Sequence, residues 1–189
     1  MNVKGKNILI TGGSLGIGKE TAKVLVDKGA NVLITGRLQN RLKEARIYTK
    51  SKIIEFDISD HKNISENAEK CIDILGGRID VLINNAGIGV KKSIDELNIE
   101  DFLKVFNVNV FGLALFTKEI VPHMIKKSFG TIINIGSTAS LKGYKNGSIY
   151  SSSKFAVRCL TQCWQAELRP HNIRVCQVNP SEVTTAFGN

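Results

Sequence analysis

The amino-acid sequence predicts a three-layer α/β fold, in which a doubly wound parallel sheet is covered by helices on both faces. Six short runs rich in β-branched residues are almost entirely apolar, as expected for strands buried on both faces. Longer amphipathic stretches separate most of these runs, and this alternation implies right-handed βαβ crossovers. The 189 residues suit one structural unit, so we expect a single domain over residues 1–189.

The predicted elements follow one another with short connections. The strands are expected at residues 6–11, 31–35, 52–56, 81–84, 131–135 and 174–178. The helices are expected at residues 15–28, 63–75, 100–125 and 151–168, with a shorter helix near 40–46. The sixth strand would leave an unpaired edge, because only a few polar residues follow it. Either the chain is shortened, or something else covers that edge.

The composition limits the classes of function. The net charge of +9 comes from 26 basic and 17 acidic residues that are scattered along the chain. Without basic blocks and interleaved aromatic residues, nucleic acid is not an expected partner, and the charge fits either an anionic cofactor or simply a basic surface. The sequence contains no run as long as a membrane-spanning helix and no secretion signal, so we expect a cytoplasmic protein without a membrane partner. The four cysteines lack paired metal-ligand spacing, so we expect no metal.

A glycine-rich turn at residues 11–18, Thr-Gly-Gly-Ser-Leu-Gly-Ile-Gly, lies between the first predicted strand and helix. Gly12 allows a tight turn, Gly16 lets the backbone approach a pyrophosphate, and Gly18 lets the helix pack closely on the strand. The free N–H groups and the dipole of the helix N-terminus would then face the phosphates. In this position the turn predicts dinucleotide binding. The expected contacts come from Gly12, Gly13, Ser14, Gly16, Ile17 and Gly18.

The end of the second predicted strand distinguishes NAD(H) from NADP(H). An acidic residue there would bind the ribose hydroxyls and repel a 2′-phosphate. This sequence instead has Gly36 followed by Arg37, and a guanidinium can hold a phosphate through two parallel hydrogen bonds. Arg41 and Lys43 add positive charge nearby. The sequence favours NADP(H) over NAD(H), and the alternative for Arg37 is an ordinary solvated arginine.

Four polar side chains are candidates for the chemistry. Tyr150 and Lys154 are one helical turn apart, so the phenol and the ammonium would lie side by side. A nearby cation favours the phenolate, so Lys154 is expected to lower the pKa of Tyr150. Ser137 follows the fifth strand, at the edge where open α/β sheets bind ligands. Asn109 lies inside a predicted helix, where an asparagine is unfavourable without a partner, so it would either pack or hydrogen-bond toward the site.

Six motifs occur in a consistent order along nearly the whole chain. They are the glycine-rich turn at residues 11–18, Asn-Asn-Ala-Gly at 84–87, Asn-Val-Phe-Gly at 109–112, Ser137, Tyr-Ser-Ser-Ser-Lys at 150–154 and Asn-Pro at 179–180. Together they resemble the motifs of short-chain dehydrogenases/reductases with a tyrosine-based active site. The resemblance implies a Rossmann fold and an oxidoreductase that moves a hydride between NADP(H) and a carbonyl or alcohol carbon. Members of the family usually continue into a C-terminal helix and a last strand, so the resemblance also implies that these elements are missing from the given sequence.

The resemblance also implies roles for individual residues. Tyr150 would donate the proton in reduction and take it in oxidation, while Ser137 would orient the carbonyl and stabilise charge on its oxygen. Lys154 would bind the nicotinamide ribose, and Asn109 would hold a water that links Lys154 to solvent. The further cofactor contacts implied are Arg37, Asp57, Ile58, Asn85, Ala86, Gly87, Tyr150, Lys154, Pro180 and Val183.

Two positions depart from the family's pattern. Ser181 stands where the family usually has Gly after the proline, and a small effect on the cofactor's outer edge is expected. Leu15 stands where NADP-binding members usually carry a basic residue within the glycine motif. The expected NADP preference therefore depends mainly on Arg37.

Within the family, the chain is most similar to 3-oxoacyl-(acyl-carrier-protein) reductases, so the substrate is expected to be a carbonyl compound or an acyl thioester. The alternative is a protein that senses NADP(H) without turnover, although such proteins tend to lose the tyrosine or the lysine. The resemblance implies a homodimer or homotetramer formed through residues 100–125 and 151–168. Candidate contacts, which could equally be core residues, are Phe102, Phe106, Phe116 and Trp164.

Overall fold

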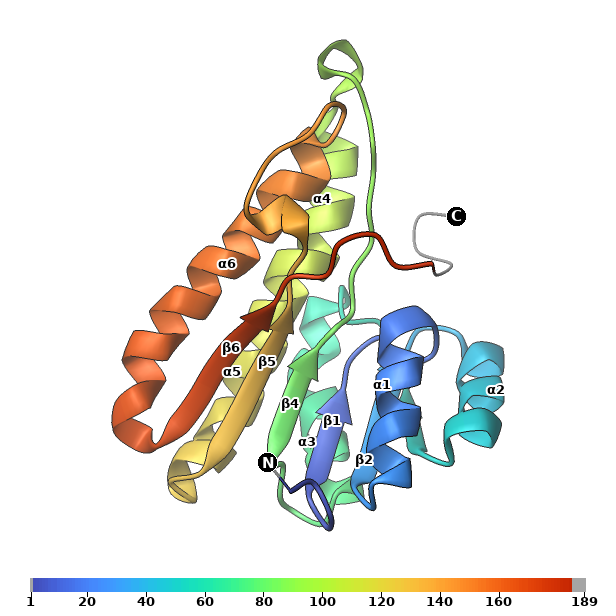
Figure 1. Ribbon diagram of the computed structural model, residues 1–189, viewed down its shortest axis with the longest axis vertical. Coiled ribbons are helices and arrows are strands. Elements are labelled where there is room, and N and C mark those ends of the chain that lie inside the picture. The colour runs from blue at the N-terminus through green and yellow to red at the C-terminus, as the bar shows by residue number, and fades with distance from the viewer. Residues whose placement is uncertain (1, 185–189) are drawn as a thin grey trace.

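The computed structural model describes residues 2–184 and contains a six-stranded sheet (Figure 1). Its strands are β1 (Asn7–Ile10), β2 (Asn31–Gly36), β3 (Lys52–Glu55), β4 (Val81–Asn84), β5 (Gly130–Ile135) and β6 (Ile173–Val178). They lie in the order β3-β2-β1-β4-β5-β6, and all neighbouring pairs are parallel. The chain therefore runs outward from β1 to β3 and then outward again from β4 to β6. This leaves a switch point between β1 and β4, where such sheets bind ligands.

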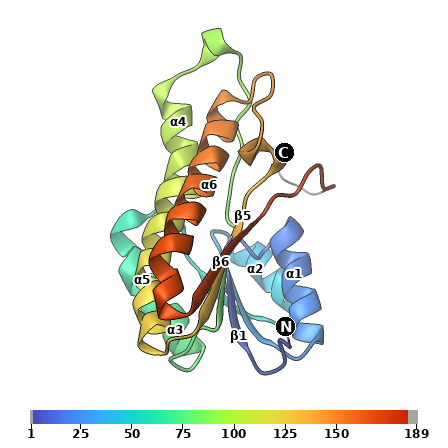
Figure 2. The same ribbon diagram turned by 60° about the vertical axis from the view of Figure 1, so that its left-hand side comes forward.

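Helices cover both faces of the sheet (Figures 1 and 2). They are α1 (Gly16–Asp27), α2 (Gln39–Thr49), α3 (Ile64–Ile74), α4 (Ile99–Phe106), α5 (Leu113–Lys126) and α6 (Ser148–Leu168). Ile8 and Ile10 of β1 pack into the core under α1 and α2, whereas Leu9 packs into the core under α3 and α5. Because successive strand residues enter different cores, the strands are apolar on both faces. The predicted three-layer, doubly wound fold is confirmed.

The helix predicted at residues 100–125 is continuous but not uniform. Helix α4 runs directly into a π-helical turn, Asn107–Gly112, which leads into α5. We call Asn107–Gly112 the π segment. Such wider turns inside α-helices occur frequently at functional sites, and this one contains Asn109.

Several other predicted boundaries differ from the structure by a few residues. Helix α2 extends over Gln39–Thr49 rather than 40–46, and α6 begins at Ser148, so Tyr150 lies within its first turn. Among the described residues, the helices are all too short or too polar to cross a membrane.

Candidate active site

The turns that follow β1 and β4 pack so closely that only glycine fits at two positions. Gly12 has a φ of +65°, and a Cβ there would lie 2.7 Å from the Cα of Ala86. A Cβ on Gly18 would lie 2.5 Å from Nδ2 of Asn85. The glycine-rich turn predicted from the sequence therefore lies directly against the Asn-Asn-Ala-Gly turn, at the switch point of the sheet.

Hydrogen bonds from Thr11 and Asn85 hold these two turns together. Nδ2 of Asn85 donates to the carbonyl oxygens of Thr11, at 3.0 Å, and Gly12, at 2.9 Å. The hydroxyl oxygen of Thr11 accepts from the backbone N–H groups of Asn85 and Ala86, both at 3.1 Å. The Asn85 amide group is thus engaged by the glycine-rich turn. Sequence reasoning did not single out Thr11, although a polar residue at the end of an apolar strand was the available signal.

The N-terminus of α1 provides the features that a pyrophosphate requires. In the described chain, no side chain caps this helix end, and its first turn contains no acidic residue. The backbone N–H groups and the positive end of the helix dipole are thus available to an anion. Ser14 lies beside the end of β2, because a Cβ on Gly36 would be 3.0 Å from the Ser14 hydroxyl oxygen. The exposed Arg37 follows directly. The uncapped end of α1 therefore suits the pyrophosphate of a dinucleotide.

Lys154 is buried beneath Tyr150 on α6. Its side chain is 5% exposed, and its Nζ lies 5.8 Å from the centre of the Tyr150 ring. The same Nζ donates a hydrogen bond of 2.8 Å to the carbonyl oxygen of Ile135, at the end of β5. Burial lowers the pKa of Lys154 to about 8. At neutral pH the group therefore remains largely charged, but it is close to losing its proton.

The pKa of Tyr150 differs from the sequence-based expectation. Burial raises it above the ordinary value, a hydrogen bond with Ser137 acts in the opposite direction, and the negative charge that Tyr144 would carry raises it further. Lys154, which was expected to lower this pKa, instead directs its ammonium group to the Ile135 carbonyl. Here, desolvation outweighs the factors that favour the phenolate.

Ser137 lies at the start of a short 3₁₀ turn, Thr138–Ser140, that follows β5. Its hydroxyl oxygen accepts a hydrogen bond of 3.1 Å from the backbone N–H of Ala139. The carbonyl oxygen of Pro180 accepts one of 2.9 Å from the N–H of Thr138. The residues after β6 thus hold the turn that carries Ser137.

Asn109 of the π segment connects the turn after β4 to α6. Its amide exchanges two hydrogen bonds of 2.9 Å with the backbone of Ile88, and Nδ2 also donates to the hydroxyl oxygen of Ser153 at 3.0 Å. A Cβ on Gly87 would lie 3.3 Å from Oδ1 of Asn109 and 3.7 Å from Nζ of Lys154. Gly87 thus allows Asn109 and Lys154 to approach the same point of the backbone.

The remaining residues that were predicted to contact the cofactor follow the carboxyl ends of β3 and β6 and differ in how exposed they are. Oδ1 of Asp57 accepts hydrogen bonds from the backbone N–H and the hydroxyl of Ser59, at 2.8 and 2.6 Å. The Ile58 side chain is 6% exposed and belongs to the core, so it is not available to a cofactor. Val183 is half exposed, with 50% of its surface accessible.

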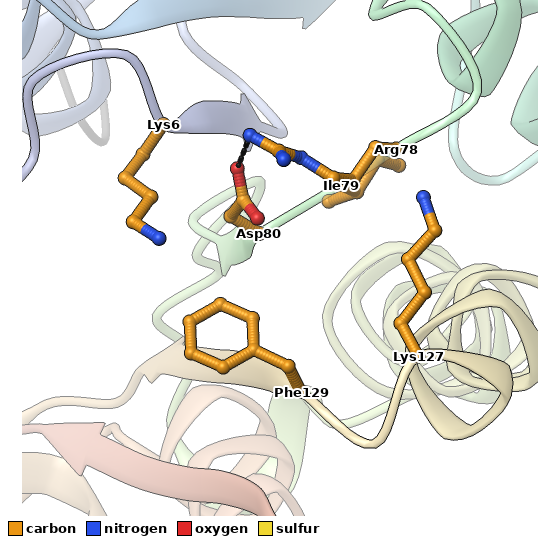
Figure 3. Close-up of a pocket in the computed structure, with 6 residues that line it drawn as sticks. All are labelled: Lys6, Arg78, Ile79, Asp80, Lys127 and Phe129. Carbon is orange, nitrogen blue, oxygen red and sulfur yellow. Dashed lines mark ion pairs between the residues drawn. The ribbon is translucent and has the colours of Figure 1, made fainter.

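A hollow lies at the amino ends of β1, β4 and β5, and the polar residues that line it hold these strands together (Figure 3). Asp80, which precedes β4, accepts a hydrogen bond of 2.8 Å from the N–H of Asn7 and pairs with Arg78 at 3.0 Å. These contacts tie the start of β1 to the start of β4. The residues that line the hollow are Lys6, Arg78, Ile79, Asp80, Lys127 and Phe129.

The comparison with protein families identifies the class of this chain. The short chain dehydrogenase family matches residues 6–189. The 3-oxoacyl-[acyl-carrier-protein] reductase of Thermotoga maritima is 36% identical over an alignment 190 positions long, which covers 98% of this chain and 77% of that enzyme. The chain therefore belongs to the short-chain dehydrogenase family of oxidoreductases, and the resemblance predicted from its motifs is confirmed.

Solved structures agree with this assignment. The 3-ketoacyl-(acyl-carrier-protein) reductase from Brucella melitensis, complexed with NADH, has a TM-score of 0.92 and 30% identity. The match covers 98% of this chain and 79% of that one. ElxO with NADP bound has a TM-score of 0.89 and 35% identity, over 96% of this chain and 75% of its own. The two related proteins thus bind different nicotinamide cofactors on the same fold.

Proposed function

We propose that this chain is an NADPH-dependent reductase that converts a carbonyl group to an alcohol, with Tyr150 as the general acid. The observation that carries the proposal is the position of the candidate residues. Ser137 and Tyr150 are hydrogen-bonded, and Lys154 lies beneath Tyr150. Asn109 approaches Lys154 at Gly87, and all four residues lie at the edge that carries the glycine-rich turn. The same residues would act in the reverse direction if an alcohol were oxidised.

The chain's own residues would manage the proton and the developing charge. The bound nicotinamide supplies or accepts the hydride. As negative charge develops on the substrate oxygen, the Ser137 hydroxyl stabilises it by a hydrogen bond, and Tyr150 transfers its phenolic proton to it. The raised pKa of Tyr150 suits this direction, because the phenol keeps its proton at neutral pH until the substrate oxygen becomes basic.

Lys154 would orient the cofactor and restore the proton. Its ammonium group, held by the Ile135 carbonyl, has further hydrogens with which to bind the hydroxyls of the nicotinamide ribose. We propose that Asn109 holds the water that connects Lys154 to solvent. Pro180 and Val183 would contact the nicotinamide end, while Gly12, Gly13, Ser14, Gly16, Ile17, Gly18, Arg37, Asp57, Ile58, Asn85, Ala86 and Gly87 would line the rest of the cofactor site.

The preference for NADPH depends on Arg37. Replacing Arg37 by Glu should lower kcat/KM for NADPH about 100-fold, because a guanidinium–phosphate pair is replaced by repulsion between two anions. The value for NADH should change much less. Arg46→Glu is the matched control, since it makes the same charge change at the exposed far end of α2. Equal losses with both cofactors, or in both variants, would contradict the assignment of the 2′-phosphate to Arg37.

The substrate is proposed to be a 3-oxoacyl thioester or a related ketone, as the name of the Thermotoga maritima relative indicates for that enzyme. NADPH oxidation, followed by absorbance with a panel of β-ketoacyl thioesters and simple ketones, tests this directly. Turnover that is fastest with the thioesters is expected. Tight NADPH binding without turnover of any compound would instead support the sensor alternative.

The chain is further proposed to act as a homodimer or homotetramer in the cytoplasm. Its four cysteines, all within the described residues, are free thiols, which suits a reducing compartment. Phe116 is fully buried in the core and is not available as a subunit contact. The other candidate contacts, Phe102, Phe106 and Trp164, are partly exposed. Within residues 100–125 and 151–168, the more exposed large apolar side chains are Leu103, Phe111, Leu115 and Phe155.

A further inference from the structure

The loop that follows β3 touches the π segment at both of its ends. Near the end of the segment, a Cβ on Gly112 would overlap the carbonyl oxygen of Ile58, so the two backbones are in close contact. At the start of the segment, Nε2 of His61 lies 3.0 Å from the carbonyl oxygen of Asn107. Asn109 lies between these two contacts. The position of its backbone therefore depends on a loop that is distant in sequence.

The contact made by His61 has a defined chemistry. A carbonyl oxygen only accepts hydrogen bonds, so the proton of this bond resides on Nε2 in both the neutral and the charged ring. The His61 ring also meets Phe111 edge-on, with a centroid distance of 6.3 Å and an interplanar angle of 79°. The His61 side chain thus donates a hydrogen bond to the backbone of the π segment and packs on a side chain of the same segment.

We propose that His61 is a positioning residue, which holds the π segment against the loop after β3 and thereby fixes Asn109 in place. The inference rests on the proposed function, because it assigns His61 to the reaction in which Asn109 takes part. The same loop carries Asp57 and Ile58, the proposed adenine contacts. His61 therefore joins the adenosine side of the cofactor site to the residue that holds the proton relay.

The geometry of the π-helical turn explains why a hydrogen bond from His61 would stabilise the π segment. A π-helical turn replaces the regular i→i−4 bonding of the helix and is found in short stretches only. A hydrogen bond from outside the helix favours this arrangement over the regular one. If the π segment relaxed toward an α-helix, Asn109 would rotate away from Ile88 and Ser153, the partners of its amide.

Two substitutions separate the hydrogen bond from the ring contact. His61→Phe retains a ring against Phe111 but has no donor, whereas His61→Gln retains an N–H donor without the ring. We expect His61→Phe to lower kcat about tenfold and to leave the KM of the carbonyl substrate within about twofold, because His61 is not among the residues proposed to contact the substrate. His61→Gln should keep most of the wild-type kcat.

Hydrogen–deuterium exchange of residues 107–112 in the same three proteins provides a readout independent of activity. Exchange should be faster in His61→Phe and close to wild type in His61→Gln. A wild-type kcat in His61→Phe, or equal losses in both variants, would overturn the inference while the proposed function stands. If the wild type turned over no substrate, the proposed function would fail, and unchanged exchange in His61→Phe would overturn the contact itself.

Discussion

Replacing Tyr150 by Phe should lower kcat for carbonyl reduction about 1000-fold while the chain continues to bind NADPH. A positioned general acid typically contributes factors of this size, and the substitution removes only the hydroxyl. The ring remains above Lys154, whose bond to the Ile135 carbonyl does not involve Tyr150. Steady-state NADPH oxidation measures the loss, and the quenching or enhancement of NADPH fluorescence measures binding.

Tyr144→Phe is the matched control for this experiment. Tyr144 is close enough that its charge would raise the pKa of Tyr150, yet its side chain is 43% exposed. The same loss of a hydroxyl there should leave kcat within about threefold of the wild type. If Tyr150→Phe retained more than a tenth of the wild-type kcat, Tyr150 would not be the acid. Equal losses at both tyrosines would indicate a general disturbance of the loop after β5.

The fold was predictable because its determinants are local in sequence. The runs that form the strands are apolar on both faces, and the turn after β1 combines the end of a strand, glycines and the start of a helix. The length of these runs and the spacing of their apolar residues are therefore enough to predict βαβ units. The boundaries of β4, at Val81–Asn84, agree with the prediction. Helix α6 begins at Ser148 rather than at residue 151, and Gly147 occupies its N-cap position.

The parts of the site that the sequence did not reveal depend on contacts between distant residues. The π segment differs from a regular helix over only six residues, too few to change the apolar periodicity. His61 is 46 positions away from Asn107, and no motif connects them. The pKa of Tyr150 depends on how deeply the ring is buried, which spacing along a helix does not determine. Sequence motifs thus identified candidate residues, whereas burial sets their protonation.

Lys154 is expected to increase the rate of the reaction and, because it is buried, to lower the free energy of unfolding. Burial lowers the pKa of this lysine from 10.5 to about 8, so its folded form binds a proton more weakly than its unfolded form. The resulting destabilisation is fully present below about pH 8 and disappears as the pH rises toward 10.5. Replacing Lys154 by Met should therefore remove a cost of about 3 kcal/mol at pH 7.

The loss of the hydrogen bond to the Ile135 carbonyl would offset about 1 kcal/mol of this gain. We therefore expect Lys154→Met to be more stable than the wild type by about 2 kcal/mol at pH 7, measured by urea unfolding. The advantage should shrink as the pH rises above 8, and kcat should fall about 100-fold or more, because the ribose would lose its ammonium partner.

Lys142→Met serves as the control, since Lys142 is exposed in the loop after β5 and its removal should change the free energy of unfolding by less than about 0.5 kcal/mol. If the Lys154→Met variant were less stable than the wild type at pH 7, the hydrogen bond to the Ile135 carbonyl and the packing of the lysine would outweigh the free-energy cost of burying its charge. A stable variant with wild-type kcat would remove Lys154 from the mechanism. We expect higher stability together with lost turnover. A buried charged group stabilises the fold less than a buried apolar group does. Only the charged group, however, can bind the ribose and supply a proton.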